Sequence, residues 1–330
     1  MTCCNAGVEE GTFDDLANHW QQLITNCDEP TFFDSLAWHK AWWSKFGNDA
    51  ELKLLVVRSS NGELTMIAPM MIEGSEISFL GGTDLVDYHD FLTRDRQNSE
   101  YVDAVVSKVS SMNGINKIVL QSIPGNSPTI GQFREAVENH GWKVSLEQED
   151  VAPRMELPAS WDDYVSGLRK KDRHELRRKL RRLDGAGEYR HVELKSPEDI
   201  TDAMPEFMRL HRMSTPDKNE FMTEDREQFF TKIAVELARE GITRLTFLEF
   251  EGQREATSLS FVCGGVRYLY NSGYNPAQYK LSVGLLNHAL SIKSSIQDGS
   301  RIFDFMRGNE PYKYHLGGVD RQVFALTATR

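Results

Sequence analysis

Residues Tyr268–Gly318 read YLYNSGYNPAQYKLSVGLLNHALSIKSSIQDGSRIFDFMRGNEPYKYHLGG. The order of residue types predicts a strand, a polar loop, a helix from Gly284 to about Gln297, and a buried strand at RIFDFMRG. A helix that opens on Ser282-Val283-Gly284 presents unpaired backbone N–H groups, which suit a phosphate. Gln278 and Lys280, just upstream, add hydrogen-bond donors. The alternative interpretation is an ordinary N-cap supplied by Ser282.

Polar side chains gather where the buried strand ends. Asp304 alternates with two phenylalanines and points away from their face, either as a functional carboxylate or as a cap on a neighbouring loop. Tyr312 is a candidate proton donor to a leaving group, and Lys313 a candidate charge for a phosphate or a developing oxyanion. Ligand groups collect at strand ends of this kind in open α/β sheets. The candidate substrate-binding residues nearby are Tyr274, Arg307 and Glu310.

The two halves of the chain have the same predicted order. ITRLTFLEF, ATSLSFVCG and VRYLYNSG precede the helix and buried strand of the second half, while LKLLVVRS, LTMIAPMMI, EISFLGG, a helix and KIVLQSIP form the first. We therefore predict a duplicated α/β (α+β) fold with mixed, mostly antiparallel sheets flanked by helices. Pro153 and Pro158 place the boundary near residue 155, which gives domains 1–155 and 156–330. In the first half, the alternation of Leu64–Ile72 predicts a half-buried strand, and Pro69 predicts an edge or a bulge.

The composition excludes several classes of protein. The 330 residues include no apolar run of transmembrane length, and the N-terminus does not resemble a signal peptide, so we expect a cytoplasmic protein. Four cysteines, Cys3 and Cys4 among them, and nine histidines show neither disulfide nor metal-ligand spacing. We therefore predict no metal, and a reduced tail at Cys3 and Cys4. G-x-S-x-G, Walker and G-x-G-x-x-G motifs do not occur.

Charge is unevenly distributed. The net charge of −11 divides into −13 for residues 1–150, with 10 Lys+Arg and 23 Asp+Glu, and +2 for the remainder, with 28 and 26. Arg169–Arg182 holds nine Lys/Arg in fourteen positions, while Leu168, Leu176, Leu180 and Leu183 keep one helical face apolar. This basic segment indicates contact with a phosphate-bearing ligand or an anionic polymer, against the alternative of a solvated helix face. We expect no DNA partner.

The loop of the first half that corresponds to this region is Asp87-Tyr88-His89-Asp90. Asp87, Tyr88 and Asp90 would suit an amine or sugar acceptor, and a plain polar loop is the alternative.

The second half resembles the GNAT-type acyltransferases of the CelD/BcsL group. The residues that carry the resemblance are SWDDYVSGLRKKDRHELRRKLRRL, YLYNSGYNPAQYKLSVGLLNHAL and FDFMRGNEPYKYHLGG, with FFDSLAWHKAWW and DLVDYHDFL in the first half. The spacing is more remotely similar to that of the Fem aminoacyltransferases. The glycine-rich pyrophosphate loop of the GNAT family is reduced here to Gln278…Gly284, with Ser282-Val283-Gly284 where many relatives carry Ser-Pro-Gly.

The resemblance implies tandem GNAT folds, with the acyl donor in the second domain and a degenerate donor site on the acceptor side in the first. It implies an acyltransferase that moves an acyl group from acyl-CoA, for example acetyl-CoA, to an amine or hydroxyl acceptor such as a saccharide or cell-envelope precursor. Asp304, or a water that it orders, would take the acceptor's proton, Tyr312 would protonate the thiolate, and Lys313 would stabilise charge. An aminoacyl-tRNA-dependent transferase, with tRNA at Arg169–Arg182, is one alternative. A non-catalytic accessory protein of polysaccharide biosynthesis is the other.

Overall fold

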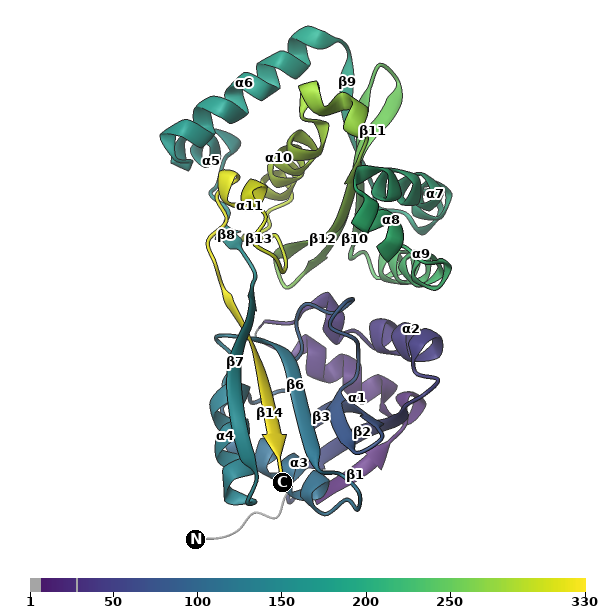
Figure 1. Ribbon diagram of the computed structural model, residues 1–330, viewed down its shortest axis with the longest axis vertical. Helices are drawn as coiled ribbons and strands as arrows, with labels where there is room; N and C mark the ends of the chain where they lie inside the picture. The colour runs from purple at the N-terminus through teal and green to yellow at the C-terminus, as the bar shows by residue number, and fades with distance from the viewer. Residues whose placement is uncertain (1–6, 28) are drawn as a thin grey trace. The chain divides into compact units, whose positions relative to one another are not determined.

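The computed structural model describes residues 7–27 and 29–330, and the predicted tail with Cys3 and Cys4 lies outside them. The chain divides into two compact units (Figure 1). The first contains Met1–Val151 and Arg321–Arg330, and the second contains Ala152–Asp320. The sequence-based domains differ from these units at the C-terminus, because the last ten residues belong to the first unit.

In the first unit the helices are α1 (Phe13–Thr25), η1 (Phe32–Asp34), α2 (Leu36–Phe46), α3 (Ser99–Ser110) and α4 (Thr129–Asn139). The strands are β1 (Gly7–Gly11), β2 (Glu51–Arg58), β3 (Leu64–Glu73), β4 (Glu76–Phe79), β5 (Leu92–Thr93), β6 (Lys117–Pro124), β7 (Lys143–Val151) and β14 (Gln322–Thr329). They form a sheet of order β1-β2-β3-β4-β6-β14-β7, with β5 beside β3. Among the strands that the described residues form here, β4 and β6 are the one parallel pair.

β14 is the strand that the sequence-based division assigned to the other domain. It lies between β6 and β7 and pairs antiparallel with both. Leu326 and Ala328 of β14 are fully buried in the core that the sheet forms with α3 and α4. The end of the chain thus completes the sheet of the first unit (Figure 1).

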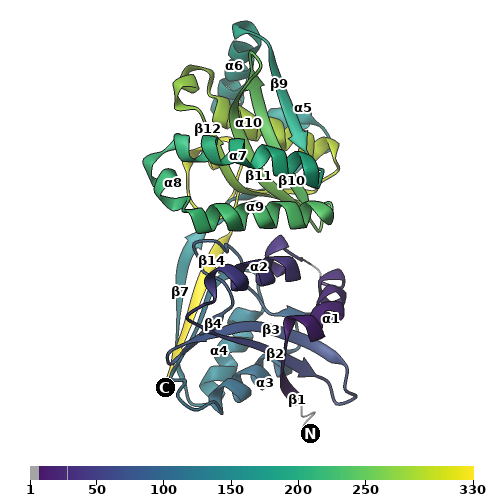
Figure 2. The ribbon, with the colours of Figure 1, turned by 90° about the vertical axis from the view of Figure 1, so that its right-hand side faces the viewer.

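β3 corrects two expectations. Its residues Leu64–Met71 are buried in succession, so the strand is covered on both faces rather than half-buried. The reason is that α1 packs on the face opposite α3, as Figure 2 shows. β3 is also a central strand, but Pro69 falls between the residues that pair with β4 and those that pair with β5. Pro69 is opposite Leu54 of β2, but it has no ladder partner on the side of β4 and β5, where a residue without an N–H is tolerated.

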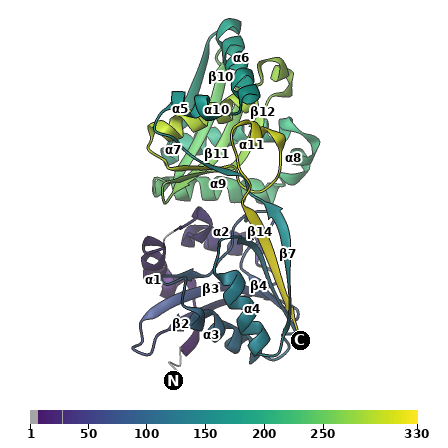
Figure 3. The ribbon, with the colours of Figure 1, turned by 90° about the vertical axis from the view of Figure 1, so that its left-hand side faces the viewer.

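The strands of the second unit are β8 (Arg154–Glu156), β9 (Tyr189–Leu194), β10 (Thr243–Phe250), β11 (Gln253–Cys263), β12 (Val266–Tyr274) and β13 (Ile302–Asp304). The helices are α5 (Trp161–Gly167), α6 (Lys170–Ala186), α7 (Pro197–Ser214), α8 (Pro216–Phe221), α9 (Glu224–Arg239), η2 (Pro276–Leu281), α10 (Val283–Gln297) and α11 (Pro311–His315). The sheet has the order β8-β13-β12-β11-β10-β9. α7 and α9 cover one face (Figure 2), and α10 covers the other (Figure 3).

The predicted duplication is confirmed by the two sheets. β1-β2-β3-β4-β6 and β9-β10-β11-β12-β13 have the same order, and in each only the last pair is parallel. A helix, α3 or α10, connects the two parallel strands in each unit. The fold is therefore two tandem mixed sheets flanked by helices, as the sequence predicted.

The strand predicted at RIFDFMRG is shorter than expected. β13 ends at Asp304, and the next residues turn, with φ of 63° at Met306 and 105° at Gly308. Positive φ values are incompatible with a continuing strand. The turn places the polar residues after Asp304 beside the open end of the sheet described below.

Candidate functional site

The start of α10 is the first component of the site. Ser282 occupies the N-cap position in a left-handed conformation, and its side chain does not cap the helix. Its Oγ instead accepts a hydrogen bond of 2.6 Å from Lys179 Nζ of α6. Arg182 of α6 donates to the carbonyl of Lys280 at 2.7 Å. The alternative of an ordinary Ser282 cap is therefore wrong, and two cations lie at this helix start.

The other residues predicted at this loop have different surroundings. Gln278 donates its side-chain amide to Glu255, at 3.1 Å, so Glu255 holds that amide in place. Val283 is buried and offers its backbone, while the side chain of Lys280 is exposed. Gly284 lies against the ring of Tyr274, and a Cβ at Gly284 would be 3.1 Å from the ring. A side chain at Gly284 would therefore press on Tyr274, and glycine leaves room for that ring.

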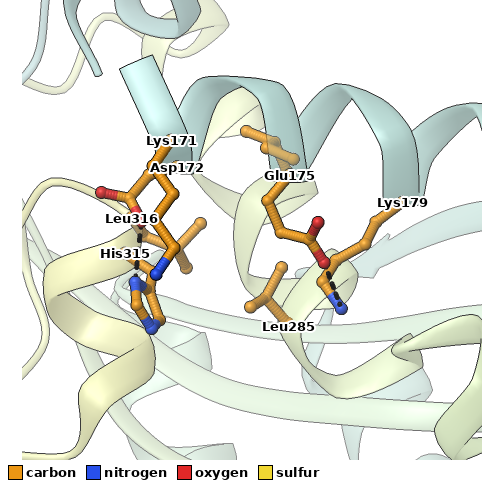
Figure 4. A pocket seen from close by; sticks show the side chains of 8 residues that line it. Lys171, Asp172, Glu175, Lys179, Leu285, His315 and Leu316 are labelled. Atoms are coloured by element: carbon orange, nitrogen blue, oxygen red, sulfur yellow. Dashed lines mark hydrogen bonds and ion pairs between the residues drawn. The ribbon is translucent and has the colours of Figure 1, made fainter. Parts of the chain in front are cut away.

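A pocket of about 370 Å³ lies beside this loop, between α6, α10 and α11 (Figure 4). Its lining residues are Lys171, Asp172, Glu175, Leu176, Lys179, Leu285, His315 and Leu316. At one end His315 Nδ1 is 2.8 Å from Asp172, and at the other Lys179 is 3.4 Å from Glu175 (Figure 4). The pocket thus has a polar contact at each end and an apolar middle formed by Leu176, Leu285 and Leu316.

The basic helix α6 divides into an inner and an outer set of cations. The inner residues are Arg173, which donates to the end of α5, Lys179, which pairs with Glu175 and donates to Ser282, and Arg182, which reaches the carbonyl of Lys280. The exposed Arg169, just before α6, and Arg178 pair with Asp172 and Glu175 of the helix itself. Lys170, Arg177 and Arg181 are exposed. They lie at i, i+7 and i+11, so they share one face of the helix.

The sheet opens beside α10. β12 pairs with β13 only at Val266–Tyr268, where Tyr268 is opposite Asp304. β12 then continues to Tyr274, paired with β11 on one side but no longer with β13 on the other. The register with β11 shifts near Ser260, so that Tyr270 is an extra residue in β12. Bulges of this kind bend a strand and are frequent next to active sites.

The three predicted catalytic residues lie at this opening. Asp304 is buried and accepts the Met306 N–H at 2.8 Å. Lys313 is 2% exposed, and its ammonium donates to the carbonyls of Met306, Arg307 and Gly308 and pairs with Glu310 at 2.9 Å. Both residues therefore hold the turn after β13 in shape.

The ring of Tyr312 stacks on His288 of α10, with 5.0 Å between ring centres. Burial, aided by the charge of Glu310, raises the pKa of Tyr312, so its phenol keeps its proton. Two of the predicted substrate-binding residues contact Lys313: Glu310 is exposed and pairs with it, and the carbonyl of Arg307 accepts a hydrogen bond from it. The third, Tyr274, donates its backbone N–H to the hydroxyl of Ser214.

The residues predicted in the first unit form a separate group. Asp90 accepts hydrogen bonds of 2.6 Å from both Ser127 and Thr129, and it pairs with Arg96. It therefore ties its loop to the start of α4. Tyr88 is buried, and Asp87 is half-buried. The assignment of acceptor recognition to these residues stays a prediction.

Lys179 is a site residue that the sequence did not single out from the basic segment. It lies three residues after Leu176 and four before Leu183, which are both buried. Residues at this spacing share a helical face, so the pattern does indicate that Lys179 faces the body of the unit. Its contact with Ser282 depends on how α6 folds back and has no sequence signal.

Within residues 7–27 and 29–330, no group of three or more His, Cys, Asp or Glu is placed to hold a metal ion. In the same residues every helix is too short or too polar to cross a bilayer.

Comparison with known proteins defines the class. Residues 170–314 match the model of the acetyltransferase (GNAT) domain, and the search of curated protein sequences gave no significant match. This segment contains α6, the sheet opening and the start of α10, so the second unit is similar to a GNAT-type acetyltransferase domain over most of its length, which indicates a transferase. GNAT domains typically bind acyl-CoA, and the helix start with Lys179 and Arg182 offers cations that fit the phosphates of such a ligand.

Solved structures extend the likeness to both units. The crystal structure of FemX has a TM-score of 0.68 at 11% identity, with 97% of this chain and 96% of FemX covered. The C-terminal domain of a protein assigned as a lysylphosphatidylglycerol synthetase, from Agrobacterium fabrum, has a TM-score of 0.61 at 10% identity, covering 96% and 92%. A tandem GNAT protein from the clavulanic acid biosynthesis pathway has 0.53 at 12% identity, covering 98% of each chain. At these identities the likeness shows the tandem GNAT fold alone, and membership of the CelD/BcsL group stays a prediction.

Proposed function

We propose that the second unit transfers an acyl group from acyl-CoA to an amine or hydroxyl acceptor. The observation that carries this proposal is the start of α10, where a left-handed Ser282 leaves the helix without a side-chain cap and Lys179 and Arg182 supply positive charge. The N–H groups of Val283 and Gly284 and these cations would hold the donor's phosphates.

The reacting end of the donor would lie at the opening between β12 and β13. A bound acyl-CoA supplies a thioester carbon that an amine or hydroxyl can attack. A backbone N–H of β12 beyond Tyr268 would polarise the carbonyl, since β13 no longer pairs there. Tyr312, which keeps its proton, would protonate the leaving sulfur. Asp304 and Lys313 would shape the turn that borders the opening, and the proton-accepting role predicted for Asp304 is left as a prediction.

Gly284→Asp tests the donor site. The carboxylate would lie among the groups proposed to hold phosphate, so we expect acetyl-CoA binding measured by calorimetry to weaken about 100-fold or more. The matched control is Gly131→Asp, also in the first turn of a helix but in the first unit, with open space around the glycine. Lys179→Ala should weaken binding by about tenfold. Equal affinity for acetyl-CoA in Gly284→Asp and the wild type would refute the donor site.

The second candidate is an aminoacyl-tRNA-dependent transferase, favoured by the exposed cations Lys170, Arg177 and Arg181 on one face of α6. If bulk tRNA binds through this face, replacing all three by glutamine should lower the slope of log K against log salt by about two to three units. Filter binding over a salt series measures this slope. An unchanged slope in the triple variant, or no binding of tRNA by the wild type, would leave acyl-CoA as the donor.

A further inference from the structure

Lys218 is a half-buried lysine on α8 that the predicted chemistry does not use. Its ammonium donates to the carbonyl of Ser272 and lies 3.5 Å from the Ser272 hydroxyl. Ser272 is on β12, four residues beyond Tyr268, the last residue that pairs with β13. Lys218 therefore reaches the part of β12 that borders the sheet opening.

Two lysines, Lys218 and Lys313, lie beside this opening, and their surroundings differ. Lys313 donates to three converging carbonyls and pairs with a carboxylate, so all its protons are in use. In the described part of the chain, the hydrogen bonds of Lys218 go to Ser272 alone. A neutral amine can still donate one N–H to that carbonyl while its lone pair stays available. Lys313 is thus held by its partners in the turn, whereas a neutral Lys218 keeps a lone pair that can take up a proton.

The charges around Lys218 favour the neutral amine. Burial lowers the pKa of Lys218 to about 8, Glu310 opposes this shift, and the positive charge of Lys313 adds to it. His211 of α7 and His288 of α10 also lie within electrostatic range of Lys218, and burial lowers the pKa of each to about 3. Both imidazoles are therefore neutral at the pH of interest, and Lys218 is the group near the opening that changes charge between pH 7 and 9.

We propose that Lys218 takes up the proton of the acceptor during acyl transfer. The acceptor's nitrogen or oxygen forms a bond to the thioester carbon, the carbon–sulfur bond breaks, and the electron pair leaves with sulfur. The acceptor's proton passes to the lone pair of Lys218 Nζ, and the sulfur receives a proton from Tyr312 or water. Lys218 then loses its proton to solvent. The proposal rests on the acyl-transfer function above.

The first experiment measures Lys218 without any acceptor. Trace labelling with acetic anhydride over a pH series, read by peptide mass spectrometry, should give a reactivity midpoint near pH 8 for Lys218. Saturating CoA should slow the labelling of Lys218 at least about threefold, while that of the exposed Lys232 on α9 should not change. A midpoint above pH 10, or no protection although calorimetry shows that CoA binds, would overturn the proposal.

The second experiment uses thiol release from acetyl-CoA with water as the nucleophile. In the wild type, kcat/KM should rise with pH through about 8, because the neutral amine is the active form. Lys218→Arg keeps the charge but cannot lose its proton, and Lys218→Met removes the group. Both should lose the rise and at least about 100-fold in kcat/KM at pH 9, with acetyl-CoA affinity retained. An intact pH profile in Lys218→Arg refutes the role of Lys218, whereas failure of the wild type to bind acetyl-CoA refutes the donor function itself.

Discussion

Lys313→Met should destabilise the second unit by roughly 3 to 5 kcal/mol and abolish most of its activity. The side chain is 2% exposed and its ammonium holds the carbonyls of Met306, Arg307 and Gly308 together. Methionine fills similar volume but donates no hydrogen bond, so three carbonyls lose their partner at once. Hydrogen exchange of peptides covering residues 302–316 should show the loss directly, because opening of this turn exposes its amides.

The control for this variant is Lys232→Met, which removes an exposed lysine from α9 and should change stability by less than about 0.5 kcal/mol. Lys313→Arg is informative as well, because a planar guanidinium cannot match three carbonyls that converge on one nitrogen. We expect intermediate exchange rates for it. If residues 302–316 exchange at the same rate in Lys313→Met as in the wild type, Lys313 does not hold the turn, whatever the effect of the substitution on catalysis.

Leu326→Asp should unfold the first unit while the second unit keeps its fold. Leu326 is fully buried in β14, where it is paired with Leu120 of β6 and Leu146 of β7. An uncompensated carboxylate in this core should cost about 4 kcal/mol or more. Five of the six tryptophans, including the buried Trp20, Trp38, Trp42 and Trp142, lie in the first unit, so tryptophan fluorescence reports its unfolding.

The matched control is Thr327→Asp, the next residue of β14, which points to the opposite face and is partly exposed. It should shift the urea midpoint little, since its carboxylate stays in contact with water. Acetyl-CoA binding by the Leu326→Asp variant should persist if the second unit folds independently. Equal urea midpoints for the two variants would contradict the role of β14 as a core strand of the first unit.

The duplicated fold could be predicted because its signals are local. Alternating strands and amphipathic helices specify three strands, a helix and a strand in each half. The place of β14 could not be predicted. QVFALTAT has the pattern of a strand that would suit either unit, and only its pairing with β6 and β7 assigns it to the first. β3 was misjudged for a related reason: its alternation does not reveal that α1 covers the second face.

The location of the site could be predicted from the sequence, but the role of each residue in it could not. Ser282–Gly284 was identified by its place between a strand and a helix, and the structure adds Lys179 from a distant helix. The sequence predicts Lys313 as a positive charge near the strand end, and the structure shows that its ammonium donates to backbone carbonyls of the turn after β13. Lys218 had no signal, because in PDKNEF a lysine looks like any surface residue until α8 packs it against Ser272.

The course of β14 has a consequence for biosynthesis. The first unit consists of residues 1–151 and 321–330, and its strand between β6 and β7 is supplied by residues 322–329. At about 5–20 residues per second, roughly 10 to 40 seconds pass between synthesis of β7 and synthesis of β14. During that interval the facing edges of β6 and β7 lack the strand that joins them, and chaperones can bind there. A message cut short before residue 322 would then yield a product whose first unit never closes, which marks it for degradation.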